Sequence, residues 1–162
     1  MQLMKPRVLW IEDSARLELR NLAAPVYSSG RFDFNLAEDV TSAVNLLKVT
    51  SFDAILVDVR LPPGADPRWK RLYQQTGADK VSAQLGIKLL NWLINGDRNV
   101  HPDEPPNGFD KSHLGIFTVE RREDIQDELD ALGINVFFQK TTSLPDAILI
   151  KIFDTLMDQK PM

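Results

Sequence analysis

The sequence contains no cysteine among its 162 residues, which excludes disulfide bonds and thiolate metal sites. No apolar run approaches the roughly 20 residues of a membrane-spanning helix, and the first residues are not followed by a signal-type apolar segment. The net charge is -4, so the chain lacks the positive charge that non-specific binding to nucleic acid requires. A glycine-rich loop of the kind that cradles nucleotide phosphates is absent as well. We therefore expect a cytoplasmic protein that contacts neither membrane nor nucleic acid.

Apolar residues, by contrast, make up 43% of the sequence, which is enough for a real core. The length suits one domain, which we expect to span 1–162. Four short apolar runs lie at 8–11, 54–57, 115–117 and 136–138. Unbroken apolar runs of this length are typical of strands buried on both faces, as in a parallel sheet covered by helices.

Helical patterns separate these runs. The first helix is predicted over about 15–28, capped by Ser14 and ending before Gly30, with Pro25 late in it, and a further strand follows at 32–36. Strand and helix then alternate five times, which favours an α/β fold with a doubly wound sheet. One further predicted helix follows Thr41 as its cap, and another lies between Asp79 and Gly96. Two more run from Ile125 to Gly133 and from about 144 to 158.

Two connections, at about 63–85 and 96–113, are longer than the roughly 2 to 6 residues usual in such folds. The first predicts a short helix between Asp66 as N-cap and Gly77, with Pro67 at its first position. This helix either packs its aromatic side chains on the next helix or acts as a lid or partner-docking element. Its apolar stripe would consist of Trp69, Leu72 and Tyr73.

The second connection is rich in proline and reads as an irregular surface excursion. It contains His101 and His113 together with Asp103 and Glu104. Such a group could indicate a metal site, but the ordinary polarity of a loop explains these residues more simply.

Polar residues follow each of the four apolar runs. Glu12 and Asp13 follow the first run, Asp58 the second, Thr118 the third, and Lys140 comes shortly after the fourth. The carboxyl ends of parallel strands meet at one edge of a sheet, where open α/β sheets bind ligands. We therefore expect these side chains to lie together.

The chemistry of this edge depends on its three carboxylates. Their mutual repulsion calls for a cation, and oxygen ligands favour a hard ion such as Mg²⁺. Asp58 is the predicted nucleophile toward phosphorus, forming an aspartyl phosphate, while Lys140 and Thr118 would stabilise the phosphoryl oxygens. An acidic pair after a strand also commonly caps the next helix, and that interpretation of Glu12 and Asp13 stays open.

In these residues the chain resembles the response regulator receiver domain of two-component signalling. The matching segments occur in the family's order and span nearly the whole chain. They are 8–14, 55–62, 86–90, 117–118 and 137–140. The resemblance implies a flavodoxin-like receiver fold with five parallel strands in the order 2-1-3-4-5. The 63–85 and 96–113 segments would be insertions in it.

The resemblance also implies a function. Asp58 would accept phosphate from a histidine kinase or phosphotransfer protein, and Glu12, Asp13, Asp58 and the backbone carbonyl of Arg60 would hold Mg²⁺. The protein would not be an enzyme in the usual sense, but a phosphoacceptor that assists its own phosphorylation and dephosphorylation. Its output would be a switched protein-binding surface for an unidentified partner.

Two further roles follow from the same resemblance. Thr118 and Lys140 would sense the phosphoryl group, and Phe137 would be the switch aromatic that moves together with Thr118. Together they would remodel the surface formed by the family's fourth helix, fifth strand and fifth helix.

The sequence departs from the family at Val119, where a very small residue is usual, and at Thr141, where proline is usual. The β-branched side chain of Val119 is expected to narrow access to Asp58. An alternative is therefore a degenerate receiver that acts as a phosphorylation-independent protein-interaction module. A phosphatase of the haloacid-dehalogenase type is disfavoured, because that family requires a second aspartate where this chain has Arg60.

Overall fold

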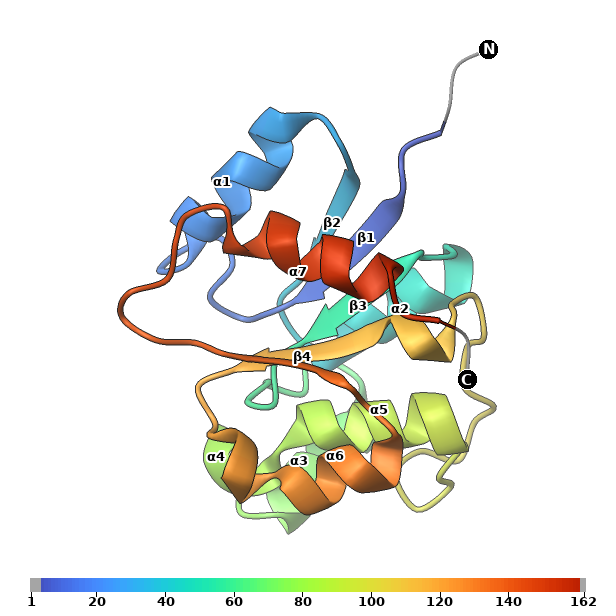
Figure 1. The fold of residues 1–162 in the computed structure, drawn as a ribbon. Coiled ribbons are helices and arrows are strands. Elements are labelled where there is room, and N and C mark those ends of the chain that lie inside the picture. Colours follow the sequence, from blue (N-terminus) through green and yellow to red (C-terminus); the bar gives the residue numbers. More distant parts are fainter. Residues whose placement is uncertain (1–3, 161–162) are drawn as a thin grey trace.

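The computed structural model describes residues 4–160 and contains a five-stranded sheet in which all neighbouring strands are parallel (Figure 1). The strand order is β2-β1-β3-β4-β5, which confirms the predicted doubly wound topology. The strands are β1 (Arg7–Ile11), β2 (Asp33–Ala37), β3 (Ala54–Val57), β4 (Leu114–Thr118) and β5 (Val136–Gln139).

Helices cover both faces of this sheet (Figure 1). Alternate side chains of β1 explain why: Val8 and Trp10 pack with α1 and α7, whereas Leu9 and Ile11 pack with α2, α5 and α6. The apolar runs of β1, β3 and β4 are unbroken because these strands are buried on both sides. The helices are α1 (Arg20–Ser29), α2 (Val40–Val49), α3 (Pro67–Gln75), α4 (Lys80–Ala83), α5 (Leu85–Asn95), α6 (Gln126–Leu132) and α7 (Ile148–Met157), with short 3-10 turns η1 (Lys111–His113) and η2 (Arg122–Asp124). No helix in residues 4–160 has the length and apolar content needed to cross a membrane.

Helix beginnings differ most from the predictions. Helix α1 begins at Arg20 instead of 15, because the carbonyl of Ser14 accepts hydrogen bonds from the N–H groups of Leu17 and Leu19 in a series of turns. It continues past Pro25 and ends, as predicted, at Gly30, whose φ of 65° is left-handed.

Three other helix boundaries also differ from the predictions. Helix α2 is capped by Asp39, whose carboxylate accepts from the N–H of Ser42 at 2.7 Å, while the hydroxyl of the predicted cap, Thr41, donates to the carbonyl of Pro63. The helix predicted between Asp79 and Gly96 is divided at Gln84, a left-handed residue, into α4 and α5. The last helix begins at Ile148, after Pro145, instead of at 144.

We call the long connections at 63–85 and 96–113 the first and second insertions. The first contains α3 where the sequence predicted it, with Asp66 accepting from the N–H of Arg68 at 2.9 Å. Trp69 of α3 is fully buried, and its ring packs edge-on against Trp92 of α5 with centroids 5.8 Å apart. This confirms the interpretation in which α3 packs its aromatic stripe on the next helix.

The second insertion is irregular, as predicted, but its description as a surface excursion is wrong at His101. This residue is only 2% exposed and lies against Trp69 and Trp92, with ring centroids 5.5 and 4.8 Å away. Loop polarity therefore does not explain His101, which belongs to an aromatic cluster joining the two insertions. We call Trp69, Trp92 and His101 the insertion cluster.

Candidate functional site

The three carboxylates predicted at the sheet edge do lie together. Glu12 and Asp13 directly follow β1 and Asp58 directly follows β3, two strands whose last residues, Ile11 and Val57, are paired in register. One carboxylate oxygen from each of the three lies within 4.8 Å of the others. Glu12 and Asp58 are almost fully buried, and the Glu12 carboxylate also accepts from the N–H of Ser14.

Lys140 supplies positive charge to this cluster. Its own N–H donates to the carbonyl of Thr118 at 2.7 Å, which fixes the residue just after β5. Its ammonium contacts the carboxylate of Glu12 and lies 3.1 Å from Oδ2 of Asp58. Burial, and then the charge of Asp58, raise the pKa of Glu12 to about 8, although Lys140 acts in the opposite direction.

These groups line a cavity of about 510 Å³ at the carboxyl edge of the sheet. Arg60 also lines it, and its N–H donates to Oδ1 of Asp58 at 3.3 Å. The role proposed for the carbonyl of Arg60 stays a prediction. Val119 is 44% exposed and is part of the cavity wall, and its narrowing of access to Asp58 stays a prediction.

Thr118 and Phe137 lie outside the residues that line the cavity. Thr118 is fully buried at the end of β4, and its hydroxyl accepts from the N–H of Glu120 at 3.3 Å. Phe137 is half-buried against the core on the side of α5 and α6, with the guanidinium of Arg122 at 5.7 Å from its ring centroid. The structure does not test the switch roles predicted for these two residues.

Sequence reasoning missed Lys80, the first residue of α4. Its ammonium lies 2.6 Å from Oδ2 of Asp13. Partial burial of Asp13 is the largest single effect and favours its neutral form. The hydrogen bonds from Lys80 and Glu12, together with the charges of Lys80 and Lys140, outweigh it, so the pKa of Asp13 is lowered. A lysine at the start of a short polar helix has no pattern that distinguishes it from a solvated one, so the sequence offered no signal for this contact.

The sequence also gave no signal for an ion pair at the edge of the cavity. Nε of Arg60 lies 2.8 Å from Oε1 of Glu120, which joins the segments that follow β3 and β4. The Glu120 side chain is mostly buried, so this pair is better shielded from solvent than most surface pairs.

Gly86 packs against the backbone of Asp58 and Val59. Its N–H donates to the carbonyl of Val59 at 3.1 Å, and an added Cβ would lie 2.0 Å from the backbone oxygen of Asp58. Helix α5 therefore begins in direct contact with the backbone of Asp58, and only glycine leaves room for this approach.

We expect Gly86→Ala to lower the free energy of unfolding by about 2–3 kcal/mol, because the methyl group must displace backbone atoms that cannot rotate away. Urea unfolding measures this change. Gly30→Ala is the control: a Cβ at Gly30 meets nothing within 4 Å, so only its positive φ matters. That strain costs about 1 kcal/mol. Equal losses in both variants would show that the contact with Asp58 is unimportant.

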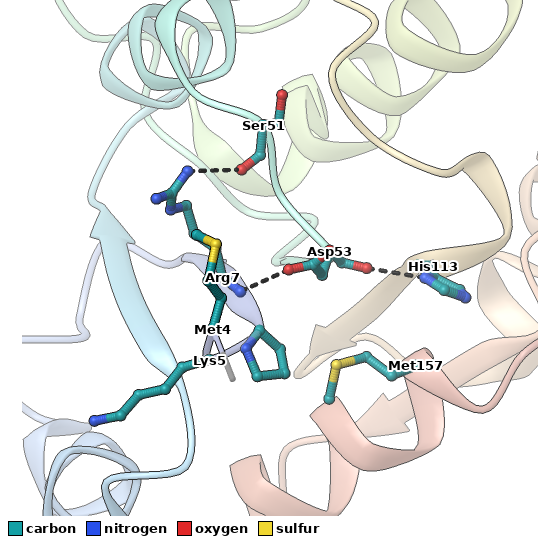
Figure 2. Close-up of a pocket in the computed structure, with 8 residues that line it drawn as sticks. Met4, Lys5, Arg7, Ser51, Asp53, His113 and Met157 are labelled. Atoms are coloured by element: carbon teal, nitrogen blue, oxygen red, sulfur yellow. Dashed lines mark hydrogen bonds between the residues drawn. The ribbon is translucent and has the colours of Figure 1, made fainter. Parts of the chain in front are cut away.

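A second cavity, of about 570 Å³, lies at the opposite, amino edge of the sheet (Figure 2). The N–H of Arg7 donates to the carboxylate of Asp53 at 2.8 Å, and the ring of His113 hydrogen-bonds the carbonyl of Asp53 at 2.9 Å. Arg7 also pairs with Asp33. The polar groups of Arg7, Asp53 and His113 therefore bond one another. His113 connects the segments that precede β3 and β4.

The donor set at the carboxyl edge fits a hard divalent cation. Three carboxylate oxygens converge, and two of the three residues are buried. Oxygen-only donors of this kind suit Mg²⁺, which keeps several waters and takes few protein ligands. Among residues 4–160, Glu12, Asp13 and Asp58 are the one group of acidic or histidine side chains that converges in this way, and His101 and His113 form no such group.

Comparisons with known proteins identify the fold. No protein-family model matches the sequence, and no curated protein matches it. Solved structures, however, match nearly the whole chain. A CheY-like response regulator receiver domain from Methanospirillum hungatei has 16% identity and a TM-score of 0.58, with 94% of each chain covered.

Two further receiver domains are similarly close. The receiver domain of a sensor histidine kinase from Pseudomonas aeruginosa, solved with a magnesium ion coordinated in its active-site cleft, has 20% identity and a TM-score of 0.54, with 95% of this chain and 98% of that chain covered. The non-phosphorylated HemR receiver domain from Leptospira biflexa has 16% identity and a TM-score of 0.54, with 98% of both chains covered. The chain therefore has the receiver fold that the sequence predicted.

Proposed function

We propose that this protein is a phosphoacceptor receiver of two-component signal transduction, in which Asp58 accepts a phosphoryl group. One observation carries the proposal. The carboxylate of Asp58 stands in a cavity of about 510 Å³ with an ammonium 3.1 Å away and two further carboxylates within reach of a shared cation. A nucleophile, a positive charge for the transferring group and a cation site are the parts that phosphoryl transfer needs.

In the proposed reaction an oxygen of Asp58 forms a bond to phosphorus while the bond from phosphorus to a histidine nitrogen of the donor breaks. The leaving histidine takes the electron pair. The ammonium of Lys140 neutralises charge on the phosphoryl oxygens, for which its position 3.1 Å from Asp58 Oδ2 is suited. Glu12, Asp13, Asp58 and the Arg60 carbonyl would hold Mg²⁺, which when bound supplies further positive charge to those oxygens.

The proposed output is a change of surface. Thr118 closes β4 beside the site and Phe137 lies half-buried in β5, so a movement of both would alter the surface of α6, β5 and α7. The donor would be a histidine kinase or phosphotransfer protein, and the recipient a protein partner in the cytoplasm. On this proposal the chain assists its own phosphorylation and dephosphorylation without acting on a separate substrate.

Incubation with acetyl phosphate and Mg²⁺, followed by intact mass measurement, tests the nucleophile. The wild-type chain should gain one phosphoryl group and Asp58→Asn should gain none, because a carboxamide cannot attack phosphorus in this way. Asp127→Asn, an exposed position in α6, is the matched control and should behave as wild type. Phosphate added to Asp58→Asn would disprove the assignment.

The alternative, a binding module that needs no phosphorylation, is favoured by two specific observations. Two lysines, Lys80 and Lys140, already pair with the three carboxylates of the acidic cluster, and Val119 forms part of the cavity wall. The same incubation separates the two functions: a phosphorylation-independent module would gain no phosphoryl group even as the wild-type protein.

A further inference from the structure

The backbone at Lys80 is held firmly, although the residue belongs to an insertion. Asp79 caps α4 by accepting from the N–H of Ser82 at 2.8 Å, and Ala83, at the other end of α4, is fully buried. The approach to α4 contains Ala78 in a left-handed conformation, with φ of 57°. A residue with a Cβ adopts this conformation only where its surroundings impose it.

From this backbone the side chain of Lys80 reaches back into the cavity at the carboxyl edge of the sheet. Its ammonium is 2.6 Å from Asp13 Oδ2, and Lys80 lines the same cavity as Asp58 and Lys140. Lys80 and Asp13 are 67 positions apart in sequence, so the contact exists only because the insertion folds over the site.

The ammonium of Lys80 lies where it would repel a divalent cation bound by the acidic cluster. Asp13 is one of the three residues whose oxygens converge, and Lys80 holds one of its two oxygens. A cation held by the cluster would place two positive charges beside that ammonium, and like charges a few ångströms apart repel. The Lys80 side chain is 45% exposed, so it can turn into solvent when a cation arrives. Lys80 would therefore compete with a divalent cation for Asp13 without excluding that cation from the site.

We propose that Lys80 is a tethered cation of the acidic site, which competes with a divalent cation for Asp13 and thereby sets the affinity of the site for that cation. The inference rests on the proposed function, since it concerns the same cation site. It gives the 63–85 insertion a definite role: the insertion brings a positive charge to a cluster that the rest of the fold leaves with an excess of carboxylates.

Calorimetric titration of the full chain with MgCl₂ tests the inference, with no phosphodonor present. We expect Lys80→Met to bind Mg²⁺ about tenfold more tightly than the wild type, because a half-exposed competing charge is removed. Lys80→Arg keeps the charge and should stay near the wild type. Lys70→Met removes the same charge from an exposed position of α3 and should also stay near the wild type.

An affinity of Lys80→Met equal to or weaker than that of the wild type would overturn the inference, as would an absence of binding in both proteins. Binding by Lys80→Met alone would support it. The thermal unfolding midpoint of each variant confirms that the protein titrated is folded. The incubation with acetyl phosphate tests the proposed function separately, because the titration measures cation binding whether or not Asp58 accepts phosphate.

Discussion

Replacing Trp69 by alanine should lower the free energy of unfolding by about 3–5 kcal/mol, which is the usual cost of removing a fully buried large aromatic side chain. Trp69 is fully buried and packs against Trp92 at 5.8 Å and His101 at 5.5 Å. Urea unfolding followed by circular dichroism measures the change.

Two further variants make this prediction specific. Trp69→Phe retains most of the packing and removes an indole N–H that has no acceptor among residues 4–160, so we expect it to cost less than about 1.5 kcal/mol. Arg71→Ala on the exposed side of α3 should change stability by less than about 0.5 kcal/mol. A small effect of Trp69→Ala would mean that α3 is attached only loosely.

The insertion cluster also explains how an added segment can act on the site. Trp69 fixes α3 against α5, and the indole N–H of Trp92 donates to the carbonyl of Asp103 at 3.0 Å, which fixes the second insertion. The chain from α3 to α4 is short, so anchoring α3 also limits where Lys80 can lie. The 63–85 segment, although long for this fold, thus contributes to the hydrophobic core through Trp69.

The sheet and the residues at its edge could be predicted from the sequence because both follow from one pattern. Strands buried on both faces give unbroken apolar runs, and parallel strands bring the residues after those runs to one edge. The structure accordingly places Glu12, Asp13, Asp58 and Lys140 together. Thr118 lies at the end of its strand as expected, although it is buried behind the cavity wall.

Helix beginnings and the contacts of the insertions could not be predicted in the same way. Leu17 fitted the helical apolar pattern, yet it is 74% exposed in a turn, because short-range hydrogen bonds to Ser14 compete with the helix. His101 sits in a polar, proline-rich segment whose composition indicates a surface loop. Its burial depends on Trp69 of α3 and Trp92 of α5, whose rings meet His101 only in the folded chain.

Lys140→Met should destabilise the protein in a manner that depends on pH. In the wild type the pKa of Glu12 is raised from 4.5 to about 8, so between these values the folded state binds a proton that the unfolded state has lost, and stability falls as pH rises. Lys140 lowers that pKa both by its charge and by a hydrogen bond. Without it, the buried carboxylates of Glu12 and Asp58 lose their common ammonium.

We expect the loss of stability in Lys140→Met to be about 3–5 kcal/mol near pH 9, the usual cost of removing one partner from a buried ion pair. Near pH 4.5 the loss should be less than about half as large, because Glu12 is then largely protonated in the folded protein. Methionine preserves the apolar stem of the side chain, so packing changes little. Urea unfolding at the two pH values, with a chelator present, measures both losses.

Lys151→Met, at an exposed position of α7, removes the same charge away from the site and should cost less than about 0.5 kcal/mol at either pH. Glu12→Gln provides the complementary test, because it removes the titrating group while keeping its shape. In a protein that carries Glu12→Gln, the losses of stability caused by Lys140→Met at the two pH values should differ less. A loss that is the same at both pH values would contradict the prediction, because it would show that the stabilisation by Lys140 does not depend on the ionisation of Glu12.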